Sequence, residues 1–375
     1  MLLLSSAMRQ GVPHVHRAQA AIGRAARAFS NGDGPSAPTI KVDGERVELS
    51  HFVAQGPIIK ACIGSDAAGA IDAKAWEARG ALLMADIGIG QVDADGGQRL
   101  SQAEAVRVYQ YYLPLYEWIS GQISGRGTGR GPLFVGVSCP QGGGKTTLVD
   151  SLVGLFADQG LSCAAMSLDD FYLTHADQLA VKESNSGNRL LELRGNPGTH
   201  DMSLALRTVE SLRDGESHDE HAIPRYDKSC FGGKGDRFPA DQWSRLVGTP
   251  DVVLFEAWCF GFSAVDESEL TDRDLIPINA LLDEGGDYAK LHAMMGAWIV
   301  IQIESPKVVY RWREQAEVAL RENGRGGMSE TELTDFVSRY MPAYAHYLPG
   351  LYADSAGYSP LYIQIDDNRN PLQMK

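Results

Sequence analysis

The sequence predicts a three-layer α/β fold built on a mostly parallel sheet of five strands. Short apolar runs alternate with stretches of helical periodicity, and near-continuous apolar strands are typical of parallel sheets that are covered on both faces. Polar motifs follow most of these runs, and ligands of such sheets bind at the carboxyl ends of the strands. The five predicted strands are Leu133–Val137, Cys163–Leu168, Val252–Phe255, Trp298–Ile303 and Leu361–Ile365.

A glycine-rich turn follows the first predicted strand and leads into a helical pattern. Backbone N–H groups of such a turn converge on anionic oxygens, so we expect it to bind ATP through its phosphates. Lys145 is expected to reach the β- and γ-phosphates, and the Thr146 hydroxyl to bind Mg²⁺. The alternative is a glycine-rich loop beside a surface lysine. The predicted fold is therefore that of a P-loop NTPase, with nucleotide-binding residues Pro140, Gln141, Gly142, Gly143, Gly144, Lys145, Thr146 and Thr147.

Cys139 departs from the usual spacing of this loop, Gly-x-x-x-x-Gly-Lys-Ser/Thr, which has a glycine at that position. A helix N-terminus lowers the pKa of a nearby thiol, so one hypothesis is that oxidation of Cys139 blocks ATP. The alternative is a small residue that simply fits, because free cysteine often behaves as a small hydrophobe. The cysteines have no zinc-site spacing, which favours free thiols in a reducing compartment.

Composition excludes several classes of protein. A net charge of −14 argues against general nucleic-acid binding, which relies on a basic face. An anionic substrate must therefore be attracted by a local cluster of cations. No apolar run approaches the roughly 18 residues of a membrane helix, so we expect no membrane partner.

The first 130 residues precede the predicted sheet. Residues 1–32 contain four arginines and no acid, which predicts an organellar transit peptide, with mitochondrial processing possible at Arg27-Ala28-Phe29-Ser30. The alternative is an ordinary tail. Residues 33–130 are predicted to form a helical accessory segment, with a helical pattern over Glu104–Ile123 that Pro114 interrupts and a glycine-rich linker at its end. The kinase-like core is predicted over residues 131–375.

Acidic residues follow the second and third predicted strands. Asp169 is a candidate to accept the proton of an attacking hydroxyl, to orient that hydroxyl or to help hold Mg²⁺. Asp170 is the competing candidate, and an acidic helix N-cap is the structural alternative for both. Glu256 follows four apolar residues, as does the acid that binds Mg²⁺ directly or through water in NTPase sites.

Two loops rich in glycine, proline and charge lie between these strands and suit a small polar substrate. Arg194, Arg225 and Lys228 are candidates to bind a carboxylate, with bidentate geometry available to the arginines. Asp201 is a candidate to bind a sugar-like hydroxyl, and Tyr226 of the second loop is a further candidate substrate-binding residue. The alternative is a solvated loop with Asx turns. His200 is interpreted as structural.

A basic helical stretch follows the fourth predicted strand. Arg311 and Arg313 precede Arg321, Arg325 and Gly326-Gly327. A basic helix followed by a glycine hinge suits a lid near residues 307–328 that closes over ATP. Its arginines are expected to neutralise charge on the transferring phosphoryl group. A charge-laced surface helix is the alternative.

Several co-linear motifs over roughly residues 100–372 resemble those of the D-glycerate 3-kinase family of plants and algae. They include the glycine-rich turn, Asp169-Asp170-Phe171-Tyr172-Leu173-Thr174, Arg194-Gly195-Asn196-Pro197-Gly198-Thr199-His200-Asp201, Pro224-Arg225-Tyr226-Asp227-Lys228-Ser229, Phe255-Glu256-Ala257-Trp258, Phe336-Val337-Ser338-Arg339-Tyr340 and Asp366-Asp367-Asn368-Arg369-Asn370-Pro371. The resemblance implies ATP-dependent phosphorylation of D-glycerate at its 3-hydroxyl, in the photorespiratory pathway of the chloroplast. It also implies kinship with uridine kinase, phosphoribulokinase and pantothenate kinase, and assigns the catalytic base to Asp169.

We therefore expect a monomeric kinase whose partners are ATP and D-glycerate. One alternative is a related kinase that acts on a nucleoside or sugar phosphate. Another is a nucleotide-binding regulator that hydrolyses ATP slowly or not at all. Asp169 and the lid arginines speak against a regulator, because nucleotide binding alone requires neither.

Overall fold

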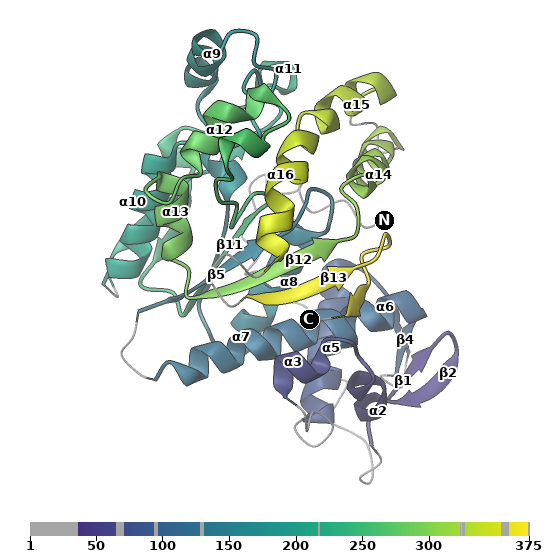
Figure 1. The fold of residues 1–375 in the computed structure, drawn as a ribbon. Helices are drawn as coiled ribbons and strands as arrows, with labels where there is room; N and C mark the ends of the chain where they lie inside the picture. The colour runs from purple at the N-terminus through teal and green to yellow at the C-terminus, as the bar shows by residue number, and fades with distance from the viewer. Residues whose placement is uncertain are drawn as a thin grey trace. The chain divides into compact units, whose positions relative to one another are not determined.

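The computed structural model describes residues 37–64, 71–93, 97–127, 131–216, 218–322, 324, 327–353 and 360–373 (Figure 1). The predicted transit peptide over residues 1–32, and Arg325 and Gly326 of the predicted lid, lie outside these residues. The chain divides into two compact units that do not follow chain order. One contains residues up to Gly127 together with Thr146–Leu161 and Ile363–Lys375, and the other contains Thr128–Lys145 and Ser162–Tyr362.

A six-stranded sheet of order β14-β13-β12-β5-β11-β6 forms the centre of the α/β fold. Five of its strands are the predicted ones, each within two residues of its expected bounds: β5 (Leu133–Ser138), β6 (Cys163–Ser167), β11 (Val252–Ala257), β12 (Ala297–Ile303) and β13 (Leu361–Ile365). The prediction of five strands was one short. The sixth strand, β14 (Pro371–Gln373), pairs antiparallel with β13, and three residues are too few to produce an alternating pattern.

Parallel pairing aligns the carboxyl ends of the central strands. Every residue of β5, β11 and β12 is buried, as the continuous apolar runs predict. Glu256 of β11 lies opposite Val137 on one side and Ser167 on the other. The loops that leave β5, β6 and β11 therefore begin at the same edge of the sheet.

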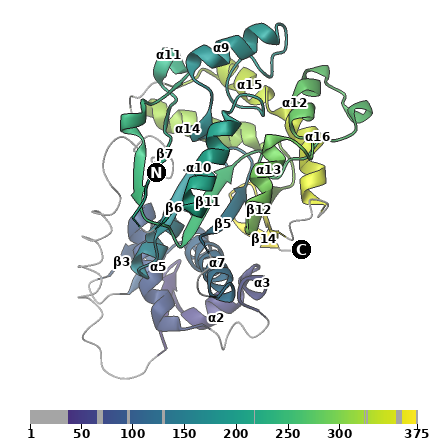
Figure 2. The same cartoon turned by 90° about the vertical axis from the view of Figure 1, so that its left-hand side faces the viewer.

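The remaining elements of this second unit connect the strands (Figure 2). Helices α10 and α13 pack side by side (Figures 1 and 2). Short strands pair as two hairpin-like ribbons, β7 with β10 and β8 with β9. The bounds are α9 (His175–Ser184), α10 (Met202–Asp214), β7 (Glu220–Ile223), β8 (Tyr226–Asp227), α11 (Cys230–Gly233), β9 (Asp236–Arg237), β10 (Ser244–Val247), α12 (Ile276–Leu281), α13 (Asp287–Ala293), α14 (Val308–Glu322), α15 (Glu330–Ser338) and α16 (Met341–Tyr352).

The N-terminal segment is not purely helical, which corrects the sequence-based prediction. It contains a four-stranded sheet of order β2-β1-β4-β3, with strands β1 (Thr39–Val42), β2 (Glu45–Glu48), β3 (Gln91–Val92) and β4 (Gln98–Leu100). These strands have at most four residues, too few for local periodicity to reveal them, and the parallel pairing of β1 with β4 joins Ile40 to the distant Gln98. Its helices are α2 (Leu49–Ala54), α3 (Ile59–Ile63), α5 (Ala73–Ile87), α6 (Gln102–Arg107) and α7 (Leu113–Gly125).

Pro114 interrupts the predicted helix less than expected. A single π-helical segment, Val108–Tyr112, separates α6 from α7, and Pro114 lies in the first turn of α7. The N–H of Leu113 donates to the carbonyl oxygen of Val108 five residues earlier, so the helical path continues through the π-helical segment into α7. The part of the chain that is described contains no helix long and apolar enough to cross a bilayer.

Candidate active site

The glycine-rich turn links β5 to α8 (Lys145–Asp158), as predicted. Gly142 and Gly144 have φ of +78° and +93°, in the left-handed region that glycine adopts at little cost. A Cβ atom at Gly142 would lie 2.7 Å from Cβ of Trp312 on α14, so this glycine also permits close packing against that fully buried tryptophan. These features are typical of a phosphate-binding loop, and packing against Trp312 limits its movement.

Hydrogen bonds within the turn and from α16 hold the turn in place. Lys145 Nζ donates to the carbonyl oxygen of Cys139 at 2.7 Å, and the backbone N–H of Gln141 donates to the hydroxyl of Tyr344 at 3.0 Å. Tyr344 is buried on α16, and burial raises its pKa well above the ordinary value, so it stays protonated. The loop is therefore braced by α14 and α16 of the same unit.

Cys139 is fully buried at the base of the loop. Its Sγ contacts the carbonyl oxygen of Pro140 at 3.4 Å, and a Cβ atom at Gly143 would lie 2.3 Å from the sulfur. The thiol thus occupies space that the glycine leaves open. This placement supports the interpretation of Cys139 as a small residue that fits, because a thiol without solvent access reacts slowly with oxidants.

Asp169 lies in a 3₁₀ turn, Leu168–Phe171, directly after β6, and Ser167 rather than either aspartate caps that turn. Its Oδ2 pairs with Lys228 Nζ at 2.5 Å, and its Oδ1 accepts a hydrogen bond from the Tyr172 hydroxyl at 2.9 Å. Burial raises the pKa of Asp169, but Lys228, Lys145 and the Tyr172 hydroxyl outweigh it, and the pKa falls below its usual range. Asp169 is therefore ionised at neutral pH.

Asp170, the competing candidate, has a structural role in this arrangement. It is buried, pairs with Arg225 at 3.0 Å and accepts a hydrogen bond from the backbone N–H of Tyr226. Arg225 also donates to the Ser244 hydroxyl at 2.7 Å. These contacts fasten the loop before β8 to the turn after β6, so the guanidinium of Arg225 and the backbone N–H of Tyr226 are engaged by protein partners.

Asp201 and Arg194 are likewise held by protein partners. Asp201 caps α10 through the N–H of Leu204 and pairs with Arg237 at 3.1 Å, which matches the Asx-type alternative. Arg194 donates to the carbonyl oxygens of Gly233, at 2.7 Å, and of Lys234, and its guanidinium lies over the ring of Tyr226. Of the predicted substrate-binding residues, Lys228 is the most exposed cation beside Asp169, with 55% of its side chain accessible.

The residues proposed for Mg²⁺ have suitable chemistry. Glu256 is buried near the end of β11, Thr146 is the second residue of α8, and Asp169 follows β6. Within the described residues, no group of three or more His, Cys, Asp or Glu side chains forms a metal cage. Mg²⁺ usually binds through one or two carboxylates together with phosphates and water, so a site of this kind fits it without such a cage.

The predicted lid arginines lie on α14. Arg313 pairs with the buried Glu317 at 2.9 Å and lies over the ring of Phe336 on α15, whereas Arg311 is exposed. Glu317 also accepts a hydrogen bond from the backbone N–H of Met328 at 3.0 Å. In this conformation Arg313 joins α14 to α15, and Arg311 is the arginine of the pair that faces solvent.

Sequence reasoning gave no role to an aromatic group beside Asp169. Tyr172 stacks on His200, whose Nδ1 lies 2.8 Å from the hydroxyl of Tyr288. Burial lowers the pKa of His200 to about 4, although the nearby Asp169 acts to raise it, so this histidine is neutral at physiological pH. Its interpretation as structural agrees with these contacts. Tyr172 is the residue that was missed, because a tyrosine near an apolar strand gives no sequence signal of a carboxylate partner.

The fold and its glycine-rich loop define a P-loop kinase. No family model matches the chain. However, chloroplastic D-glycerate 3-kinase of Arabidopsis thaliana is 38% identical over 352 residues, which cover 90% of this chain and 75% of the relative. The chain belongs to the D-glycerate 3-kinase family.

Two further proteins are similar to the chain. The uncharacterized kinase mug58 of Schizosaccharomyces pombe is 37% identical over 257 residues, covering 65% of this chain and 91% of that protein. The structure of D-glycerate 3-kinase from Cryptococcus neoformans aligns with a TM-score of 0.63 at 28% identity, over 70% of this chain and 98% of that chain. The expected P-loop kinase fold is confirmed.

Burial of Cys139 predicts that its thiol resists alkylation in the native protein, with or without ATP. Native protein treated with iodoacetamide, quenched, digested and analysed by mass spectrometry should show modification of the partly exposed Cys230 long before Cys139. Both should react after unfolding. Labelling of Cys139 that ATP blocks would contradict the burial and restore the redox hypothesis.

Proposed function

We propose that this protein transfers the γ-phosphoryl group of ATP to the 3-hydroxyl of D-glycerate, giving 3-phosphoglycerate and ADP. The observation that carries the proposal is the pair of Asp169 and Lys228, 2.5 Å apart at the edge of the sheet from which the phosphate loop also leaves. D-glycerate has a hydroxyl at one end and a carboxylate at the other. A base beside a partly exposed lysine suits both groups of one small molecule.

The acid–base chemistry follows from the charge state of Asp169. Ionised at neutral pH, it accepts a hydrogen bond from the substrate hydroxyl and takes its proton as the new O–P bond forms. The Tyr172 hydroxyl occupies one oxygen of the carboxylate and so limits its rotation. Lys228 retains N–H donors for the substrate carboxylate, because an ammonium group has three.

The phosphate side relies on the loop amides and Lys145. The N–H groups of Gly142 to Thr147 and the amino terminus of α8 favour bound phosphate oxygens. Thr146 and Glu256, with Asp169 as a further candidate, would hold Mg²⁺, which would neutralise phosphate charge. Arg311 and Arg313 of α14 are the proposed lid cations.

The cellular setting is proposed on sequence grounds. The Arabidopsis relative is named as chloroplastic, and residues 1–32 are rich in arginine and free of acids. We propose chloroplast import and a role in photorespiration, with a mitochondrion as the alternative and a monomer as the working unit. Imaging of a fluorescent protein fused behind residues 1–36 in a photosynthetic cell distinguishes the two organelles.

ADP release in a coupled assay should be stimulated by D-glycerate and not by uridine, ribulose 5-phosphate or pantothenate. The expected selectivity follows from a site that pairs one base with one cation. Turnover on another acceptor, with none on D-glycerate, would replace the substrate assignment. Slow ADP release that no acceptor stimulates would support a nucleotide-binding regulator.

Replacing Asp169 with Asn should lower kcat on D-glycerate by about 10²–10⁴, the usual contribution of acid–base assistance. The amide keeps the shape but cannot take the proton. Steady-state kinetics measure the change, and Asp214→Asn, an exposed acid paired only with its neighbour Arg213 in the described contacts, is the matched control. A D169N enzyme close to wild type would remove the base assignment.

Replacing Lys228 with Met should shift the acid limb of kcat/KM to higher pH and raise KM for D-glycerate. The direction follows from the pKa of Asp169: Lys228 lowers it, whereas burial raises it, so loss of Lys228 moves protonation toward neutrality. In the wild type the carboxylate stays ionised down to its lowered pKa. The pH–rate profile of K228M is compared with that of Lys234→Met, a neighbouring exposed lysine. An unchanged acid limb in K228M would disprove the electrostatic role.

A further inference from the structure

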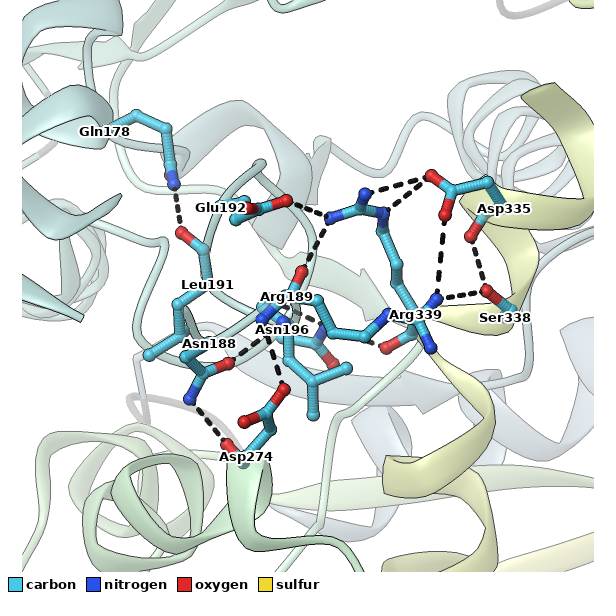
Figure 3. Close-up of polar contacts among 11 residues, drawn as sticks. Gln178, Asn188, Arg189, Leu191, Glu192, Asn196, Asp274, Asp335, Ser338 and Arg339 are labelled. Atoms are coloured by element: carbon cyan, nitrogen blue, oxygen red, sulfur yellow. Dashed lines mark hydrogen bonds and ion pairs between the residues drawn. The ribbon is translucent and has the colours of Figure 1, made fainter. Parts of the chain in front are cut away.

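The corner between α15 and α16 carries Arg339 and Tyr340, which sequence reasoning left without a role. The guanidinium of Arg339 has three protein acceptors (Figure 3). Its Nη1 donates to the carbonyl oxygen of Arg189 at 2.6 Å and to Glu192 Oε2 at 3.0 Å, and its Nε donates to Asp335 Oδ2 at 3.0 Å. Only 15% of this side chain is exposed. A planar fork of donors meets these separate acceptors, which a lysine ammonium cannot reach together.

The same α15–α16 junction also contacts the second end of the 189–196 loop, whose first end contacts the guanidinium of Arg339. The side-chain amide of the buried Asn196 donates to the carbonyl oxygens of Arg339 and Leu190, each at 3.1 Å (Figure 3). Gly195 has φ of +147°, and a Cβ atom there would lie 2.2 Å from the hydroxyl oxygen of Tyr340. Residues 189–196 are thus fastened at both ends to one dipeptide.

This loop leads to the pair that carries the proposed chemistry. Arg194 lies between the two fastened ends and donates to the carbonyl oxygens of Gly233, Lys234 and, at 3.4 Å, Lys228. These carbonyls belong to the connection that brings Lys228 to Asp169. A shift of the 189–196 loop would therefore move the support of Lys228.

The corner also reaches the phosphate loop. Burial raises the pKa of Tyr340 to about 12, and the nearby side chain of Gln141 in the phosphate loop acts to lower that pKa. The hydroxyl of Tyr344, one turn into α16, accepts the backbone N–H of Gln141 at 3.0 Å. The contact to the phosphate loop is made by Tyr344, whereas the Arg339 guanidinium contacts the loop that begins at Arg189.

We propose that Arg339 is a positioning residue that holds the 189–196 loop in the arrangement in which Arg194 supports Lys228 beside Asp169. Its guanidinium donates to Asp335, Arg189 and Glu192, so it would act on the reaction through these protein partners. The proposal deepens the function proposed above and rests on it for the kinetic consequence, whereas the effect on the loop is independent of the substrate.

The experiment compares Arg339→Ala, Arg339→Lys and the wild type. Hydrogen exchange without substrate should show faster exchange over residues 189–201 in both variants. KM for D-glycerate should rise by about 10–100-fold, the effect of a misplaced group remote from the chemistry, while KM for ATP stays within about twofold. R339K should not restore the wild-type values, because it keeps the charge but loses the planar fork. Arg213→Ala, which removes an exposed arginine paired with Asp214, is the matched control.

Two further measurements keep the outcome decisive. If R339A does not fold, Glu192→Ala removes one acceptor of the Arg339 guanidinium and should produce a smaller change in the same direction. Unchanged exchange over residues 189–201, equal changes in both KM values, or full activity of R339K would overturn the proposal. If the wild type does not turn over D-glycerate, the proposed function fails, but the exchange measurement still decides whether Arg339 positions the loop.

Discussion

The parallel pairing of β11 with β5 on one side and β6 on the other is the constraint on which the site depends. Because the three strands run in the same direction, their carboxyl ends coincide. The register sets Glu256 between Val137 and Ser167, so the phosphate loop, the buried glutamate and the turn with Asp169 start at one edge. A slip of one residue would turn Glu256 to the opposite face of the sheet. Three segments that are far apart in the chain meet only through this register.

The electrostatics of the site are local and opposite to those of the whole chain. A protein of net charge −14 repels anions on average, yet Lys145 and Lys228 both lower the pKa of Asp169. Other charged side chains near the site form ion pairs that hold loops together, Asp170 with Arg225 and Asp201 with Arg237. These partly buried pairs fasten the loops and leave Lys228 as a partly exposed cation. An ion pair with one solvent-accessible partner, such as Asp169 with Lys228, can bind a ligand as well as hold two loops together. The pairs of Asp170 with Arg225 and of Asp201 with Arg237 mainly hold the loops in place.

Elements with a long, continuous sequence pattern were predicted well. Very short strands, and contacts that depend on several segments meeting, were not. Five apolar runs and the glycine-rich turn identified the central strands and the loop, because burial on both faces marks every residue of such a strand. The strands β1 to β4 and β14 escaped prediction because each has at most four residues, too few to show an alternating pattern. The acids after β6 and β11 were found by position. The partners of Arg194, Arg225 and Asp201 were not, since a loop cation looks the same in sequence whether it binds a substrate or a carbonyl oxygen.

The sequence by itself determined the class of this protein, because strand burial, the phosphate loop and the co-linear motifs are written in consecutive residues. It also proposed Glu256 and Asp169, with Asp170 as the competitor of Asp169, as chemistry-bearing acids. It left Arg194, Arg225 and Lys228 as alternative cations for the substrate. Only the tertiary structure decided which aspartate is open to the site, with Asp170 engaged by Arg225 and Asp169 facing Lys228 and Tyr172. It likewise buried Cys139 and set Arg339 between two loops. The physical reason is that pKa, accessibility and hydrogen-bond partners are properties of neighbours in space, and those neighbours come from segments as much as 203 residues apart in the chain.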